Sequence, residues 1–84
     1  MPLSVVQLDA SGTGYWNSPL SKLESLSVIN QSGGAVTWYS DDASRAITLQ
    51  NNLILEYEEQ EAAGITTLNF TKGPANGSVT VSWD

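Results

Sequence analysis

The sequence predicts an all-β fold: a single small β-sandwich or jelly-roll-like domain of about seven antiparallel strands spanning residues 1–84. Three observations favour this class. Short segments rich in Val, Leu, Thr and Ser alternate apolar with polar residues, as half-buried strands do. Gly, Asn and Asp separate these segments at short intervals, which is typical of a sandwich or barrel. The length of 84 residues matches one domain, and no repeat or linker divides the chain.

The strands are expected in order along the chain, each ending where turn residues begin. The first ends at the glycine-containing turn of residues 11–14, and residues 15–22 are expected to be irregular around Pro19. The Ser-x-x-Glu pattern at 21–24 leaves a short helical turn open. Residues 59–64 are too short for a stable helix, so a loop or a single turn is expected there. The seven strand segments are 3–10, 26–30, 35–40, 46–49, 53–58, 65–71 and 78–83.

Alternation with a period of two separates inward from outward side chains in these segments. The strands on either side of residues 31–34 are expected to pair as a hairpin around that polar turn. In the segment 53–58, Tyr57 is expected to point inward, and Glu56 and Glu58 outward. The predicted core is Val6, Leu8, Leu26, Val28, Val36, Trp38, Ile47, Leu49, Leu53, Leu55, Leu68, Phe70, Val79 and Val81.

The charge balance argues against two classes of partner. The net charge is −6, and the only cations are Lys22, Arg45 and Lys72. Binding to nucleic acid requires several Lys or Arg side chains at the phosphates, and an anionic membrane surface repels an acidic chain. No apolar run approaches the roughly 20 residues that span a bilayer, and no basic and apolar leader follows Met1. We therefore expect neither nucleic acid nor membrane as a partner.

Residue types that carry catalysis or bind metals are scarce. The chain has no cysteine and no histidine, so we assign no catalytic, cofactor-binding or metal-ligating residue and expect no cofactor and no enzymatic activity. A Ser–Lys dyad using Lys22 or Lys72 stays open, but lysines in turns are solvated and protonated. A glycosidase-like carboxylate pair would need a deeper cleft than this small core provides. The carboxylates at 41–42 and 56–61 leave a weak cation site open.

The aromatic residues are the strongest candidates for a contact surface. Trp38 and Trp83 fall on the inward phase of their strands and are expected in the core. Tyr15 and Trp16 lie together in an expected loop, where they form either a lid over one end of the core or an interface anchor. Tyr39 alternates outward. The candidate interface is therefore Tyr15, Trp16 and Tyr39.

The small size of the domain also predicts assembly. A domain of this length buries only about 60–65% of the surface of its unfolded chain. Small domains commonly add a disulfide, a metal or a partner surface, and this chain lacks the cysteines of a disulfide and the cysteine and histidine ligands of a zinc site. Closed cyclic symmetry covers open sheet edges, so we expect a homo-oligomer, with a trimer as the first choice.

Two segments resemble parts of small virion proteins of tailed bacteriophages. The opening Val5–Thr13, followed by Trp16, is similar to the start of such proteins, and Leu26–Val36 is similar to their strand, Asn-x-Ser-Gly, strand pattern. Ile47–Leu49 and Ser78–Trp83 fit the same plan. The resemblance implies a β-sandwich without catalytic residues that decorates or cements a capsid or forms a small part of a tail or fibre.

This resemblance supplies the expected function. It implies a capsid decoration or cement protein on the outer surface of the virion, made in the host cytoplasm, whose partner is the major capsid protein or another virion protein. The alternative is a carbohydrate- or receptor-binding module of a phage tail or fibre. That alternative requires two or three exposed coplanar rings, for which Tyr15, Trp16 and Tyr39 are the candidates.

Overall fold

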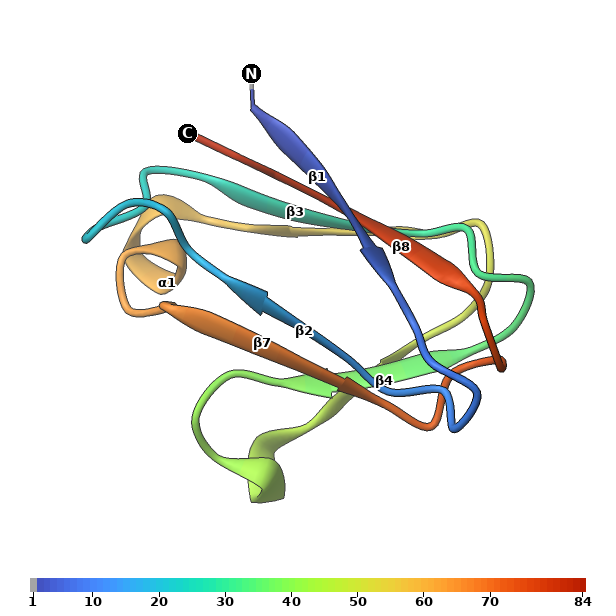
Figure 1. The fold of residues 1–84 in the computed structure, drawn as a ribbon. Helices are drawn as coiled ribbons and strands as arrows, with labels where there is room; N and C mark the ends of the chain where they lie inside the picture. The colour runs from blue at the N-terminus through green and yellow to red at the C-terminus, as the bar shows by residue number, and fades with distance from the viewer. Residues whose placement is uncertain (1) are drawn as a thin grey trace.

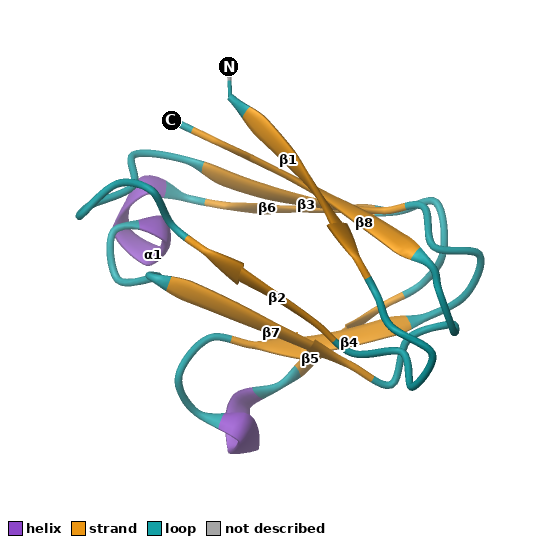
Figure 2. Ribbon diagram, in the orientation of Figure 1, coloured by secondary structure: helices purple, strands orange, loops and turns teal. Residues whose placement is uncertain are grey.

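The computed structural model describes residues 2–84, which form two four-stranded antiparallel sheets packed face to face (Figure 1, Figure 2). The β1 sheet has the strand order β1–β8–β3–β6, and the β2 sheet has the order β2–β7–β4–β5. The all-β sandwich prediction is confirmed, with one more strand than expected. The strands are β1 (Leu3–Gln7), β2 (Gly14–Asn17), β3 (Leu26–Asn30), β4 (Val36–Tyr39), β5 (Ile47–Leu49), β6 (Ile54–Tyr57), β7 (Thr67–Thr71) and β8 (Ser78–Trp83).

The strand pairing is nested. β1 pairs with β8, β2 with β7, β3 with β6 and β4 with β5, all antiparallel. The chain therefore follows the path of one long hairpin with β4 and β5 at its tip. This hairpin is wound so that successive strand pairs belong alternately to the β1 sheet and to the β2 sheet. Pairing of β3 with β8 and of β4 with β7 completes each sheet. This nested, alternating order is the jelly-roll topology.

The expected hairpin around residues 31–34 is wrong. β3 lies in the β1 sheet and β4 lies in the β2 sheet, so the turn between them crosses from one sheet to the other. Among consecutive strands, only β4 and β5 share a sheet. The physical reason is that each strand buries one face, with Leu26 and Val28 on β3 and Val36 and Trp38 on β4. Packing these faces against each other from two layers buries more apolar surface than placing the two strands side by side in one sheet.

Asn30 holds the crossing at residues 31–35 in place. It is fully buried, and its side-chain amide donates hydrogen bonds to the backbone oxygens of Gly34 and Leu49, each at 2.9 Å. Its Oδ1 accepts from the backbone nitrogen and the hydroxyl of Ser32. A buried polar group costs little free energy when all its hydrogen bonds are made, so Asn30 ties β3 to both the turn and β5.

β2 is the strand that the sequence prediction missed. Residues 15–17 were expected to belong to an irregular segment, yet they pair with β7 in regular register, with Trp16 opposite Leu68. The strand has only four residues, and Pro19 follows it closely, so the alternation was too short to stand out. The helical turn left open at 21–24 does not form. Leu23 is the one residue of this segment that is buried.

The observed core matches most of the predicted one. Two predicted members are exposed: Ile47 lies on the open edge strand β5, and Leu53 lies in the turn before β6. Leu49 and Leu55 are partly buried against the core. The remaining ten predicted members are buried, and so is Trp83, which its strand phase also placed in the core. Four further buried apolar residues complete the cluster: Trp16, Leu23, Ala62 and Ile65.

The helical content is small. The loop between β4 and β5 contains the 3-10 turn η1 (Ala43–Arg45), and the single-turn helix α1 (Glu59–Ala62) follows β6, as a loop or single turn was expected to. α1 buries Ala62 at one end of the sandwich beside Ile65. Across residues 2–84, no helix has the length and apolar character needed to cross a bilayer.

Candidate functional site

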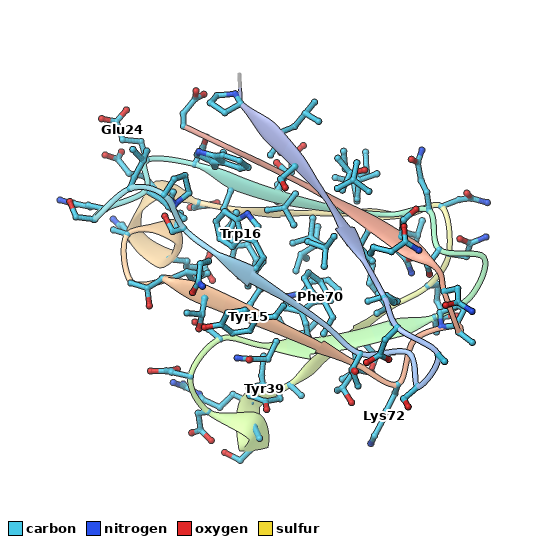
Figure 3. The ribbon with its side chains drawn as sticks, in the orientation of Figure 1. Tyr15, Trp16, Glu24, Tyr39, Phe70 and Lys72 are labelled. Atoms are coloured by element: carbon cyan, nitrogen blue, oxygen red, sulfur yellow. The ribbon has the colours of Figure 1, made fainter. Side chains whose placement is uncertain are left out.

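Tyr15 and Tyr39 come together on the outer face of the β2 sheet. Tyr15 on β2 lies opposite Asn69 on β7, and Asn69 lies opposite Tyr39 on β4, so the three side chains form one row across three neighbouring strands. Tyr15 is 55% exposed, whereas Tyr39 and Asn69 are half-buried. Figure 3 shows Tyr15 and Tyr39 on this side of the molecule. The structure thus places two of the three candidate interface residues on one face.

A groove of about 450 Å³ lies over this row. Its walls and floor include Tyr15, Tyr39, Asn69 and Thr71, and Asp9 and Thr13 lie at one end. Asp9 is the only charged residue that lines it. The sequence prediction singled out neither Asn69 nor Asp9, because their proximity to the tyrosines depends on the pairing of β2 with β7.

Asn69 is held in a fixed orientation. Its side-chain nitrogen donates to the backbone oxygen of Ser40 at 2.8 Å and to that of Tyr39 at 3.4 Å. Within residues 2–84, no donor hydrogen-bonds to its Oδ1. Asn69 therefore presents one oriented acceptor in the middle of the groove between the two rings.

Asp9 closes a tight turn at the end of the groove. Its carboxylate accepts hydrogen bonds from the Thr13 hydroxyl at 2.6 Å and from the backbone nitrogens of Thr13 and Ser11. These bonds, the Thr13 hydroxyl above all, lower the pKa of Asp9 from its ordinary value of 3.8, so the group is ionised at neutral pH.

The Asp9 turn is also fastened to the β7–β8 turn. Gly73 donates its backbone N–H to the oxygen of Gly12, and Asn76 donates to that of Asp9. Gly12 has a φ of +75°, and a Cβ built on it would lie 2.0 Å from the oxygen of Gly73. Because an L side chain is strained at this φ and would collide here, glycine is required at position 12.

Trp16 does not belong to the exposed surface. It is 5% exposed and packs against Trp83 with ring centroids 5.4 Å apart, in the space between the sheets (Figure 3). Of the two alternatives for this side chain, a lid over the core or an interface anchor, the buried ring fits the lid. The expectation that Trp16 contributes to an exposed contact surface is wrong. The reason is the alternation within β2, which turns Tyr15 outward and Trp16 inward.

A second surface, on the outer face of the β1 sheet, was not predicted as a site. Val5, Thr80, Ile29 and Ile54 occupy matching register positions and form one row across all four strands. Val5 and Ile54 are 58% and 57% exposed, and Leu3 beside them is 63% exposed. The signal was present in the sequence, because assigning Val6 and Leu8 to the core places Leu3 and Val5 outward.

Tyr57 lies at the edge of the core rather than in either surface. The indole N–H of Trp38 donates to its hydroxyl at 3.0 Å. Burial raises the pKa of Tyr57 above its ordinary value of 10.0, the charge of Glu61 acts in the same direction, and the hydrogen bond from Trp38 opposes the shift. The phenol of Tyr57 therefore stays neutral and links β4 to β6.

The acidic residues do not gather into a ligand cluster. No group of three or more Asp or Glu side chains is close enough to hold a metal ion in the part of the chain that the structure describes. Asp42 instead caps η1 by accepting from the backbone nitrogen and the hydroxyl of Ser44, which lower its pKa. Its carboxylate thus has a structural role in the loop before β5.

Comparison with protein-family models, with curated proteins and with solved structures found no match to this chain. The resemblance to phage virion proteins therefore stays a prediction. The two outer faces and the jelly-roll fold are the features of this chain from which a function can be inferred.

Proposed function

We propose that this chain is a non-enzymatic structural protein of a bacteriophage particle that docks on its partner through the outer face of the β1 sheet. The observation that carries the proposal is the row of Val5, Ile29 and Ile54, extended by Leu3, in which the three most exposed large apolar side chains, those of Leu3, Val5 and Ile54, share one face. Exposed apolar surface of this kind is typical of protein–protein contacts.

The distribution of charge supports the same face. The chain has nine acidic residues, yet Glu56 is the only charged residue at an outward position on the four strands of the β1 sheet. The cores of protein interfaces are depleted in charge, because a charge that loses its water there is seldom fully compensated. A partner that covers this face would desolvate apolar and hydroxyl groups but only one carboxylate.

The size of the face favours repeated contacts over a single tight one. Four strands about 4.8 Å apart, each of four to six residues, give a face on the order of 250 Å² in projection. A standard interface buries about 800 Å² of solvent-accessible surface per partner, which corresponds to a larger footprint than this face provides. One such contact is weak alone, but copies held together in a homo-oligomer or on a lattice gain avidity. A trimer on the outer capsid surface, contacting the major capsid protein or another virion protein, supplies this multiplicity.

The fold is consistent with the proposal at the level of analogy. Jelly rolls occur in viral capsid proteins and in lectins, and the fold alone does not choose between such functions. The two classes differ in the face that they would use here. A docking role uses the β1 sheet, and a sugar-binding role uses the groove between Tyr15 and Tyr39 on the β2 sheet.

A matched pair of lysine substitutions tests the docking face. Ile54→Lys and Thr48→Lys each add one positive charge at an exposed position, the first on the β1 sheet and the second on the β2 sheet. We expect Ile54→Lys to weaken self-association and binding to particles of the encoding phage at least tenfold, about 1.4 kcal/mol, while Thr48→Lys changes neither.

Light scattering measures the oligomer, with three times the 9.0 kDa mass of one chain expected for the unmodified protein. Co-sedimentation measures binding to particles, and circular dichroism checks that both variants stay folded. A strictly monomeric chain that ignores particles, or equal losses for both variants, contradicts the proposal.

A further inference from the structure

The groove on the β2 sheet lies on the opposite outer face of the sandwich from the row of Val5 and Ile54. A partner that covers the β1 sheet therefore leaves Tyr15, Asn69 and Tyr39 in solvent. The proposed docking function gives this groove no role, so its composition calls for a separate explanation.

The two tyrosines are placed to hold a flat, partly apolar ligand. Neighbouring strands lie about 4.8 Å apart, so Tyr15 and Tyr39 are separated by roughly 10 Å across β7. Each ring offers an apolar face and a hydroxyl tip. A pyranose ring has the complementary surface, with a patch of C–H groups on its face and hydroxyls at its rim. A separation of this size fits a disaccharide unit, with one sugar near each tyrosine.

The polar groups between the rings match the hydroxyls of a sugar. The Oδ1 of Asn69 is an oriented acceptor, because the side-chain nitrogen is already committed to Ser40 and Tyr39. Asp9 and Thr71 also line the groove, so a charged acceptor and a threonine side chain stand beside the two rings. A few oriented polar groups beside aromatic surface are the usual composition of a small-molecule site.

The charge of the site selects among ligands. Asp9 is the only charge in the groove, and the whole chain carries −6, so nucleic acids and acidic polysaccharides are repelled. We propose that the groove binds a neutral oligosaccharide, with two of its sugar residues lying along the row of Tyr15, Asn69 and Tyr39. This inference goes beyond the proposed docking function and does not depend on it.

The test is a titration of the whole chain with chemically defined probes, followed by calorimetry and by amide chemical shifts. The neutral probes are cellotetraose, maltotetraose, mannotetraose and tetra-N-acetylchitotetraose, and the anionic probes are oligogalacturonate and oligo(dT). We expect at least one neutral probe to bind and to shift the signals of Tyr15, Tyr39 and Asn69.

Four variants locate the binding. Tyr15→Ala and Tyr39→Ala are each expected to weaken binding about tenfold or more, because each removes one aromatic surface. Tyr39→Phe keeps the ring and is expected to retain most of the affinity. Ile54→Ala, on the opposite sheet, is the control and is expected to leave the affinity for the sugar probes unchanged. Tyr15 is largely exposed, so Tyr15→Ala remains informative even where Tyr39→Ala perturbs folding.

Three results overturn the inference: no neutral probe shifts the groove signals, the alanine variants bind as the unmodified chain does, or an anionic probe is preferred. Each of these leaves the Ile54→Lys and Thr48→Lys comparison unaffected, so failure of the sugar site is distinguishable from failure of the docking face.

Discussion

The two outer faces of this sandwich are built on sheets of the same size, yet they differ in chemistry. The β1 sheet presents Val5, Ile29 and Ile54 in one row that Thr80 completes. The β2 sheet presents Tyr15 and Tyr39 on either side of Asn69, and a groove lies over this row, with the Oδ1 of Asn69 as an oriented hydrogen-bond acceptor. A flat apolar strip suits a protein partner, and a polar groove between rings suits a small ligand. One small jelly roll can therefore carry two independent contacts.

The largest expected effect is on the free energy of unfolding, and it comes from Trp16, which lies in the core between the two sheets. Trp16→Ala removes a buried ring that packs on Trp83, and such truncations cost about 3–5 kcal/mol of unfolding free energy. Tyr15→Ala changes the neighbouring, exposed ring and should cost less than about 1 kcal/mol. Urea denaturation measures both.

The total free energy of unfolding of a domain this size is only about 4–13 kcal/mol, so Trp16→Ala can unfold the chain altogether. The milder Trp16→Phe should therefore be measured beside it. Equal stability losses for Tyr15→Ala and Trp16→Ala would show that β2 does not alternate as described. Docking and sugar binding should both weaken in Trp16→Ala, since each face rests on the same core.

Asn30 should have the next largest effect. Asn30→Ala removes the side-chain donor to the part-buried backbone oxygen of Leu49 and leaves that of Gly34 with only the Ser32 hydroxyl, so we expect a loss of about 2–3 kcal/mol. Asn17→Ala, at an exposed asparagine on β2, is the matched control and should be nearly neutral. Thermal or urea unfolding of the two variants measures the difference. A neutral Asn30→Ala would mean that the crossing between the sheets is held by other contacts.

Alkaline pH should loosen the contact between β4 and β6. The pKa of Tyr57 is raised in the folded chain, so the neutral phenol favours folding. The resulting stability is fully present below the unfolded value of about 10 and is lost as the pH rises through the folded pKa. Urea midpoints measured across this range should fall for the unmodified chain and fall less for Tyr57→Phe. If the urea midpoints of the unmodified chain and of Tyr57→Phe fell in parallel, groups other than Tyr57 would be responsible for the loss of stability at alkaline pH.

Acid should affect the groove before it affects the apolar row. The pKa of Asp9 is lowered, so its contribution to stability is present above 3.8 and is lost as the pH falls through the folded value. Thr13→Ala removes the largest cause and should raise the Asp9 pKa toward 3.8, whereas Thr71→Ala should not. Carboxyl chemical shifts followed against pH distinguish the two variants. An unchanged Asp9 titration in Thr13→Ala would contradict the described turn.

Much of the fold was predictable because it depends on local patterning. Alternation in segments such as 78–83 identified β8 with its buried Val79 and Val81, and turn residues marked most strand ends. What alternation does not specify is which strands are partners. The segments flanking 31–34 looked like a hairpin, but the nested jelly-roll order sends them to different sheets. The partners are set by how apolar faces from distant segments pack, which no local window contains.

The same distinction explains the candidate sites. Tyr39 was recognised as outward from its own strand, and Tyr15 as a candidate contact residue. Trp16 was misplaced because the four residues of β2 show their alternation only once they pair with β7. The positions of Asn69 between the tyrosines and of Ile54 in line with Val5 follow from strand register, so they became visible only in the structure.

The most direct test of docking through the β1 sheet uses the absence of cysteine from the chain, which allows a single introduced thiol to report on each face. Ile54→Cys places the thiol on the β1 sheet and Thr48→Cys places it on the β2 sheet, both at exposed positions. Maleimide labelling rates are measured for the free chain and for chains assembled on phage particles. Docking through the β1 sheet predicts that assembly protects the thiol of Ile54→Cys strongly and leaves that of Thr48→Cys reactive. Protection of Thr48→Cys alone, or equal protection of both, would contradict docking through the β1 sheet.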